Sequence, residues 1–312
     1  MSVQIPLVVI AGPTGVGKTA ASIEIAKRLG GEIICCDSMQ IYKGMDIGTA
    51  KVTPEEAQGV PHHLVDIVSP EQNFSVCDYA LLCHAAIENI AQRGKLPIMV
   101  GGTGLYIDTV IDGIDFADSC CDDDYRRQME RVAAERGNEY LHSLLEKADP
   151  DSAATIHPNN VKRVIRALEY HHLTGSTISE HNRLSKQKPS PYRYCYLCLT
   201  RDREQLYSRI DMRVDIMLQQ GLADEVKRLT DSGIDRSCTA MQAIGYKEVA
   251  EFLDGYTDYP TMVDTLKRNT RRYAKRQLTW FKRREDVQFV DLSTETDCVE
   301  KCIQLIERSI AV

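Results

Sequence analysis

The sequence predicts an α/β protein with a parallel sheet at its core, a helical insertion domain and a helical C-terminal part. Three observations predict this fold. Short apolar runs alternate with helical patterns over residues 1–115. Charged helical periodicity with no strand pattern fills residues 116–189. Residues 190–312 begin with one more apolar run and then continue mostly as helices. We therefore expect a core split into two parts by an insertion.

The elements are expected in the following order. Strands are expected at Leu7–Ala11, Glu32–Cys36, Pro97–Val100 and Tyr192–Leu199. Helices of the core are expected at Lys18–Leu29, Ser75–Arg93, Arg203–Gln220, Leu222–Asp231, Cys238–Leu253 and from Pro260 to about Arg284. The insertion is expected to hold helices at Asp123–Arg136, Glu139–Lys147, Pro150–Ile156 and Asn160–Thr174, with Ser185–Pro191 as the return linker.

Composition sets limits on function. The chain has 312 residues, of which 43% are hydrophobic and 27% charged, as is ordinary for a globular protein in water. Its net charge of −7 excludes a general polyanion binder but leaves room for a local basic surface. No apolar run is long enough to span a bilayer, and the apolar N-terminus is typical of a core strand rather than a signal peptide. We expect a cytoplasmic protein without membrane association.

The cysteines favour reduced thiols over a metal site. The chain has eleven cysteines with scattered spacing. Cys195 and Cys198 form a C-x-x-C inside an expected strand, which would point them to opposite faces. No second pair with zinc-ligand spacing follows.

A glycine-rich loop after the first expected strand carries the strongest signal. It matches G-x-x-x-x-G-K-[ST] and consists of Gly12, Pro13, Thr14, Gly15, Val16, Gly17, Lys18 and Thr19. Glycines let the backbone N–H groups turn inward, and the N-terminus of the following helix adds positive charge. Lys18 would place a charge on the phosphates, and the Thr19 hydroxyl would ligate Mg²⁺. The loop predicts a P-loop NTPase-like core with a diphosphate or triphosphate site; a glycine-rich turn without a ligand is the alternative.

Two other strand ends should lie at the same edge of the sheet, because parallel strands direct their carboxyl ends to the ligand crevice. Asp37 follows the second strand and could ligate Mg²⁺ through water or accept a proton from a substrate. Its alternative role is a turn residue that caps the next segment. Residues 101–104 form a second glycine-rich segment, which is either a place of close ligand approach or a plain strand-to-helix turn.

Two late helices carry notable basic residues. Arg209 and Arg213 share one helical face and either belong to a lid over the phosphates or form a solvated face paired with Asp211 and Asp215. Lys267–Arg284 holds no acidic residue. Its nine basic residues are Lys267, Arg268, Arg271, Arg272, Lys275, Arg276, Lys282, Arg283 and Arg284. In an acidic protein such a helix favours contact with a nucleic-acid backbone, and a merely solvated helix is the alternative.

Taken together, these residues resemble the tRNA dimethylallyltransferase family, the prenyltransferases that modify the adenine next to the anticodon. The resemblance covers nearly the whole chain. Its motifs are residues 12–19, Asp37-Ser38-Met39-Gln40-Ile41-Tyr42, residues 48–51, Pro61-His62-His63-Leu64, Gly101-Gly102-Thr103-Gly104-Leu105-Tyr106, Arg166-Ala167-Leu168-Glu169, Gln242-Ala243-Ile244-Gly245-Tyr246 and Lys275-Arg276-Gln277. No zinc-finger tail of the eukaryotic kind follows, so the chain looks like a bacterial-type member.

The resemblance implies a reaction. Dimethylallyl diphosphate would bind in the phosphate loop with Mg²⁺, Lys18 and Thr19 on its oxygens. The exocyclic amine of the adenine on the 3′ side of the anticodon would attack the allylic carbon, and pyrophosphate would leave. Asp37 matches the family's general base. Arg213 matches the arginine that, with Lys18, stabilises the departing pyrophosphate.

The resemblance also implies a partner, the anticodon stem–loop of tRNA, bound by a monomer. The positions it implies for tRNA contact are Asp37, Ser38, Met39, Gln40, Thr103, Arg126, Lys162, Arg163, Val164, Ile165, Arg166, Gln242, Ala243, Ile244, Gly245, Tyr246 and Lys247. The basic helix adds Arg271, Arg272, Lys275 and Arg276 as candidates. Three readings remain open beside this one: an ATP-dependent kinase of a nucleoside or small molecule, a prenyltransferase of free AMP, and a tRNA-binding P-loop protein without catalysis.

Overall fold

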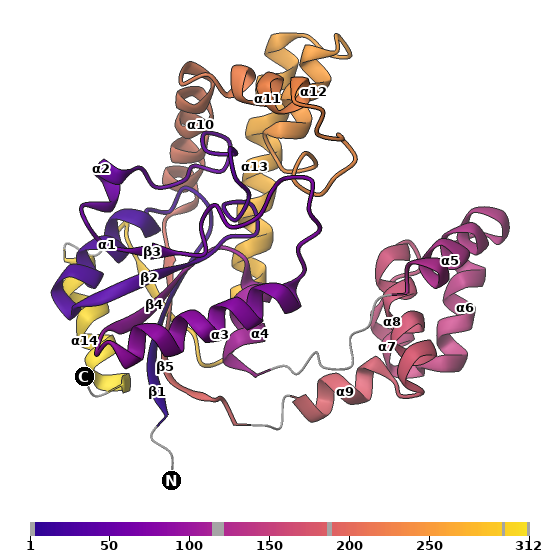
Figure 1. The fold of residues 1–312 in the computed structure, drawn as a ribbon, viewed down its shortest axis with the longest axis horizontal. Coiled ribbons are helices and arrows are strands. Elements are labelled where there is room, and N and C mark those ends of the chain that lie inside the picture. Colours follow the sequence, from indigo (N-terminus) through magenta and orange to yellow (C-terminus); the bar gives the residue numbers. More distant parts are fainter. Residues whose placement is uncertain (1–3, 114–121, 186–188, 295–296, 311–312) are drawn as a thin grey trace. The chain divides into compact units, whose positions relative to one another are not determined.

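The computed structural model describes residues 4–113, 122–185, 189–294 and 297–310. The chain forms two compact units (Figure 1). The first unit combines residues 1–111 with residues 191–312, and the second consists of residues 112–190. The insertion boundary expected between residues 115 and 116 and residues 186–188 of the expected linker lie outside the described residues.

The first unit is built on a parallel six-stranded sheet in the order β3-β2-β4-β1-β5-β6. Its strands are β1 (Ile5–Ala11), β2 (Gly31–Cys36), β3 (His62–His63), β4 (Leu96–Gly101), β5 (Tyr192–Thr200) and β6 (Gln288–Asp291). The central strand β1 pairs with β4 on one side and, across the insertion, with β5 on the other. The predicted parallel α/β core is confirmed. The edge strands β3 and β6 were not predicted, because runs of two and four residues are too short to show an alternating pattern.

The helices of the first unit are α1 (Lys18–Leu29), α2 (Pro54–Ala57), α3 (Val76–Gln92), α4 (Gly104–Ile111), α10 (Arg203–Gln219), α11 (Leu222–Asp231), α12 (Tyr246–Leu253), α13 (Tyr259–Phe281) and α14 (Cys298–Ile310). The helices α1 and α14 cover one face of the sheet, and α3 and α4 cover the other (Figure 1). Val8 and Ile10 pack with α1 and α14, whereas Leu7 and Val9 pack with α3 and α4. Strand alternation thus creates two cores, and it also places Cys195 and Cys198 in different ones, as predicted.

A third core joins α10–α13 to the segment after β2. It includes the fully buried side chains of Tyr42, Met45 and Tyr246. The helix expected at Cys238–Leu253 is wrong in its first half, because α12 begins only at Tyr246. Gly245 has φ +101°, which ends any helix there, and the apolar residues before it are buried in turns.

The second unit consists of helices, as the periodicity predicted. They are α5 (Asp123–Arg136), α6 (Asn138–Ala148), α7 (Pro150–Thr155), α8 (Val161–Thr174) and α9 (Ile178–Ser185), of which α9 was not predicted. Met129, Leu141 and Val164 lie in their common core. In neither unit do the described residues include a helix long and apolar enough to cross a membrane.

Candidate functional site

The phosphate loop connects β1 to α1 and requires its glycines. Gly15 and Gly17 have φ +79° and +111°, in the region that favours glycine. A Cβ on Gly12 would lie 2.6 Å from the carbonyl oxygen of Leu199, so β5 leaves no room for a side chain there. The loop therefore exposes backbone N–H groups directly before the N-terminus of α1, the arrangement that binds phosphate.

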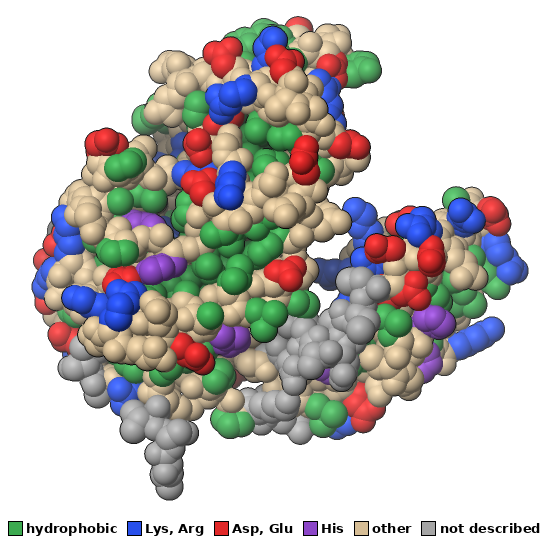
Figure 2. All heavy atoms as spheres, in the orientation of Figure 1, with side chains coloured by type: hydrophobic (Ala, Val, Ile, Leu, Met, Phe, Trp, Pro, Cys, Tyr) green, Lys and Arg blue, Asp and Glu red, His purple; other side chains and the backbone are tan. Residues whose placement is uncertain are grey.

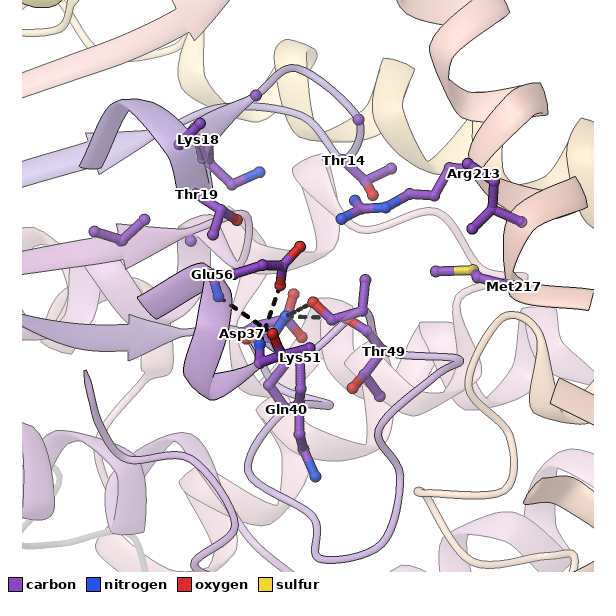
Figure 3. Close-up of a pocket in the computed structure, with 18 of the residues that line it drawn as sticks. Thr14, Lys18, Thr19, Asp37, Gln40, Thr49, Lys51, Glu56, Arg213 and Met217 are labelled. Atoms are coloured by element: carbon purple, nitrogen blue, oxygen red, sulfur yellow. Dashed lines mark hydrogen bonds between the residues drawn. The ribbon is translucent and has the colours of Figure 1, made fainter. Parts of the chain in front are cut away.

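Lys18 and Thr19 direct their side chains into the cavity below this loop (Figure 3). Lys18 Nζ donates hydrogen bonds to the carbonyl oxygens of Gly12 and Pro13, both at 2.9 Å. Burial lowers the pKa of Lys18 to about 8, although the Asp37 charge opposes this shift. A bound polyanion would stabilise the ammonium form, so this lysine is suited to a diphosphate.

Asp37 lies at the carboxyl end of β2 and is held in a turn. Its Oδ1 accepts the N–H of Met39 at 2.9 Å, so Asp37 does cap the following turn. The same turn is tied to the end of β4, because Thr103 Oγ1 accepts the Ser38 N–H at 3.1 Å and the Thr103 N–H donates to Cys36 at 3.1 Å. The capping role and the functional role are thus compatible, since Asp37 also lines the cavity.

Gln277 joins the two glycine-rich segments. This side chain of α13 is 5% exposed. Its Oε1 accepts the Thr14 N–H at 2.9 Å, and its Nε2 donates to the Gly102 carbonyl at 3.0 Å. A Cβ on Gly102 would collide with this amide, which explains why a glycine is needed there. Gln277 belongs to the motif Lys275-Arg276-Gln277, but the sequence alone predicted no role for it.

Arg213 projects from α10 toward the phosphate loop (Figure 3). It is half-buried, and burial lowers its pKa. On the same face, Arg209 Nε donates to the Gly15 carbonyl at 2.9 Å. Asp211 and Asp215, the partners in the alternative reading, instead form ion pairs with Arg271 and Lys267 of α13. The two arginines therefore face the loop, as expected of a lid.

Two cavities meet beside these residues. The larger, about 810 Å³, lies under the phosphate loop between α1, α10 and the segment 46–58. The smaller, about 290 Å³, is lined by Ser38, Met39, Tyr273, Arg276 and residues 242–245. Both cavities are lined by Thr14, Asp37, Thr49, Ala50, Arg213 and Met217. A space under the phosphate loop and a second, mainly apolar space thus share a wall that contains a carboxylate and a guanidinium.

Three positions expected to contact tRNA have buried side chains. Val164 and Ile165 are 0% and 4% exposed in the core of the second unit. Tyr246 is 0% exposed, packs against Gly48 and donates its hydroxyl hydrogen bond to Glu225. These three side chains thus serve packing, and contact of their segments with tRNA stays a prediction. Lys162 and Arg163, in contrast, are exposed on α8.

Arg126 and Arg166 of the second unit are held by one carboxylate. Glu169 is 0% exposed and accepts hydrogen bonds from Arg126 at 2.8 and 3.0 Å and from Arg166 at 2.8 Å. The Asp122 N–H donates to the same carboxylate at 2.9 Å. Although burial opposes it, these hydrogen bonds hold the pKa of Glu169 below its ordinary value. The arrangement fixes two partly exposed arginines side by side.

Some basic residues of α13 and of the residues that follow it are paired with carboxylates of the protein, which the sequence did not indicate. Besides Lys267 and Arg271, Arg284 is paired, with Asp108 and Asp286. In the α10–α12 region of the first unit, at the top of Figure 2, basic and acidic side chains are intermixed on the visible face. Arg272, Lys275 and Arg276 are exposed. Lys267, Arg271 and Arg284 are thus engaged within the protein, and contact of Arg272, Lys275 and Arg276 with a nucleic-acid backbone stays a prediction.

Comparisons with known proteins identify the family of this chain. The family model described as IPP transferase matches residues 40–284. The tRNA dimethylallyltransferase of Halalkalibacterium halodurans is 52% identical over 299 residues, which cover 96% of this chain and 95% of the relative. That of Bacillus subtilis is 51% identical over 292 residues, covering 94% and 92%.

Solved structures give the same result. The tRNA isopentenylpyrophosphate transferase of Bacillus halodurans superposes with a TM-score of 0.73 at 49% identity, covering 98% of this chain and 95% of that one. A eukaryotic dimethylallyltransferase acting on tRNA gives a TM-score of 0.81 at 32% identity, covering 96% and 77%. The resemblance found in the sequence is thereby confirmed, and the chain belongs to the IPP transferase family.

Proposed function

We propose that this protein is a tRNA dimethylallyltransferase. It transfers the dimethylallyl group of dimethylallyl diphosphate to the exocyclic amine of the adenine on the 3′ side of the tRNA anticodon. The observation that carries this proposal is the wall shared by two cavities, which brings Asp37 and Arg213 to the boundary between a phosphate-binding space and a space for a base. The family membership and the names of the relatives support the same activity.

The diphosphate binds under the phosphate loop. Backbone N–H groups before α1, the Lys18 ammonium and the Arg213 guanidinium supply positive charge to its oxygens. As the bond from the allylic carbon to the diphosphate oxygen breaks, negative charge builds up on the pyrophosphate. Fixed cationic groups in a half-buried site stabilise that charge more than water does, which lowers the barrier.

The residues fit Mg²⁺ as a cofactor held mainly by the substrate. Mg²⁺ keeps several waters and takes only one or two protein oxygens in phosphate sites. The Thr19 hydroxyl is the protein oxygen placed for this role, and Asp37 lines the same cavity. No cluster of three or more His, Cys, Asp or Glu able to hold a metal occurs among the described residues. The ion would neutralise phosphate charge.

The adenine enters the smaller cavity. A base stacked in the anticodon loop has to leave its stack to reach this space, and the apolar surfaces of Tyr273 and Met39 can receive its ring. Its exocyclic amine is a poor nucleophile because the lone pair is delocalised into the ring. Asp37 accepts a proton from that amine as the carbon–nitrogen bond forms.

The proposal has consequences for the location and the oligomeric state of the protein. The substrate tRNA places the reaction in the cytoplasm, and all groups assigned to the diphosphate come from one chain, so a monomer suffices. A kinase would use the phosphate loop and a neighbouring space for its acceptor, but it has no need of the exposed basic residues Arg272, Lys275 and Arg276. A tRNA-binding protein without catalysis has no need of the Lys18, Asp37 and Arg213 set.

The experiment that tests the proposal measures pyrophosphate release and ATP hydrolysis with the purified protein and Mg²⁺. We expect pyrophosphate release from dimethylallyl diphosphate only when unmodified tRNA is present, and no tRNA-dependent or nucleoside-dependent ATP turnover. Replacing tRNA with AMP tests the shorter acceptor and should give no product. Turnover of ATP to ADP with a small acceptor, and none with dimethylallyl diphosphate, would contradict the proposal in favour of a kinase.

A further inference from the structure

Glu225 of α11 is a buried carboxylate that the proposed reaction does not use. It is 1% exposed. Its Oε2 accepts the N–H groups of Asp46 and Ile47, both at 2.9 Å, and its Oε1 accepts the N–H of Gly48 at 3.1 Å. Three successive backbone N–H groups thus converge on one carboxylate, in the way that such groups surround a bound anion.

The Tyr246 hydroxyl completes this set of donors. It donates to Glu225 Oε1 at 2.6 Å, and because burial and the Glu225 charge raise the pKa of Tyr246, the phenol stays protonated. The Tyr246 ring occupies the space beside Gly48, where a Cβ would come within 2.5 Å of it. Outside these contacts, the exposed Arg228 guanidinium lies 4.0 Å from the carboxylate. Burial of this charge is therefore offset mainly by four hydrogen bonds.

A neutral side chain could not replace this carboxylate. A glutamine has only one acceptor oxygen. Its NH₂ group would face at least one of the backbone N–H groups whose hydrogen bonds Glu225 now accepts. Those donors would then lie in a buried site without an acceptor, which is costly. The position of residues 46–48 thus depends on the charged form of one residue, far away in sequence on α11.

The segment held by Glu225 forms part of the wall between the two cavities. Asp46 and Ile47 line the larger cavity, Gly48 lines the smaller one, and Thr49 and Ala50 line both. The carbonyl groups of the segment are held from the other side, since Gln40 Nε2 donates to Thr49 at 2.9 Å and to Ala50 at 3.2 Å. Ala50 has φ +51°, so the segment keeps an unfavourable backbone conformation that needs such support.

We propose that Glu225 is a positioning residue for prenyl transfer. By fixing residues 46–50, it sets the wall of the junction at which the allylic carbon and the adenine amine meet. The inference rests on the proposed function only in taking this junction as the place of bond formation. Because a misplacement of about 1 Å at a reacting centre can cost roughly 100-fold in rate, a shift of this wall should slow the chemical step.

The test compares the full-length Glu225→Gln variant with the wild type by two readouts. Hydrogen exchange at the amides of residues 46–48 reports the hold on the segment and does not depend on the reaction. Single-turnover prenyl transfer at saturating tRNA and dimethylallyl diphosphate reports positioning. We expect faster exchange at these amides and a single-turnover rate that is about 10- to 100-fold lower, with unchanged affinity for tRNA.

Asp149→Asn is the matched control, because Asp149 is also a buried carboxylate, 1% exposed, that accepts hydrogen bonds from two backbone N–H groups and two side-chain hydroxyls. It should leave the exchange of residues 46–48 and the single-turnover rate at saturation unchanged. Glu225→Asp keeps the charge with a shorter reach and should recover part of the rate, which also serves if Glu225→Gln does not fold.

Wild-type exchange at residues 46–48, or a wild-type single-turnover rate, in a folded Glu225→Gln variant would overturn the inference. So would an equal loss of rate in Asp149→Asn, since the loss of any buried carboxylate would then explain the effect. Failure of the proposed function is distinguished by the wild type, which would form no prenylated tRNA at all, whereas the exchange readout would still report whether Glu225 holds the segment.

Discussion

The backbone N–H of Thr14 in the phosphate loop donates to Gln277 Oε1 of α13 across 263 residues of sequence, at 2.9 Å. The same side chain donates to Gly102. The side-chain amide carries an acceptor oxygen and a donor nitrogen on the same carbon. It therefore joins the N–H of Thr14 in one loop to the carbonyl of Gly102 in the other. The Thr14 N–H is thereby committed to the protein, and phosphate has to be bound by the later N–H groups of the loop.

Gln277→Glu should disrupt this connection while preserving its shape. The carboxylate can still accept from Thr14 but faces the Gly102 carbonyl with no hydrogen to donate. We expect kcat/KM for dimethylallyl diphosphate to fall by about 10- to 100-fold, the range for small displacements in a reacting site. Thr279→Ala, an exposed position on the same helix, is the control and should behave as wild type. Equal kinetics of Gln277→Glu and Thr279→Ala would show that the two loops hold their positions without this amide.

Asp37→Ala should lower the rate of prenyl transfer by roughly two to four orders of magnitude, the range for loss of a general base. Binding of tRNA should change much less, because phosphate contacts dominate its affinity. Single-turnover rates and a binding titration measure the two effects separately. A near wild-type rate would remove Asp37 from the proton transfer and leave it only its role in the turn with Met39.

Arg213→Ala should raise the activation free energy by about 2–4 kcal/mol, by analogy with loss of one preorganised donor. Arg213→Lys should recover only part of this, because an ammonium group cannot reproduce a planar fork of donors. The measurement is the single-turnover rate of both variants at saturating substrates. A wild-type rate in Arg213→Lys would mean that charge alone is sufficient at this position.

Diphosphate binding should be coupled to protonation of Lys18. The pKa of Lys18 is about 8 in the protein without a ligand. A bound diphosphate favours the ammonium form and raises this pKa, so binding takes up protons when the pH lies near or above 8. Calorimetric titrations at pH 9 in buffers of different ionisation enthalpy should reveal this uptake, and at pH 6 it should vanish. Lys18→Arg, which stays protonated, should show no uptake at either pH.

The basic helix should divide into two kinds of residue. Arg272, Lys275 and Arg276 are exposed and available to phosphates, whereas Arg271 is paired with Asp211. Neutralising the first three should flatten the plot of log tRNA affinity against log salt by up to roughly 0.7–0.9 per lost phosphate contact. Arg271→Ala should change that slope less, and affinity for dimethylallyl diphosphate should hold in all variants. An unchanged slope with lost diphosphate binding would assign this helix to the diphosphate site instead.

The sequence pattern predicted those elements of the fold that are determined by their own few residues. The apolar run of β1, the phosphate loop and the helix α1 were predicted because burial and glycine geometry act within a few residues there. The helix predicted before Tyr246 was wrong, since the apolar residues there pack into the third core from turns and not from a helix. The helix α14 was missed, although Cys302, Ile303 and Ile306 show helical spacing of buried residues.

The residues around the site also fall into those that the sequence predicted and those that it did not. Lys18 could be found because it belongs to the loop motif between β1 and α1. Asp37 could be found because it directly follows β2, at the edge where parallel topology gathers polar residues. Glu225 could not, because an acidic residue in an amphipathic helix is expected on its exposed face. Only the fold brings the N–H groups of residues 46–48 to it across more than half of the chain.

The most direct measurement of the central claim is mass analysis of nucleosides from a tRNA after incubation with the protein, Mg²⁺ and dimethylallyl diphosphate. The account predicts one new nucleoside, N6-(dimethylallyl)adenosine, which maps to the adenine on the 3′ side of the anticodon and forms roughly two to four orders of magnitude more slowly with Asp37→Ala. An unmodified tRNA after incubation with active, folded protein, or a prenyl group on another base, would contradict it.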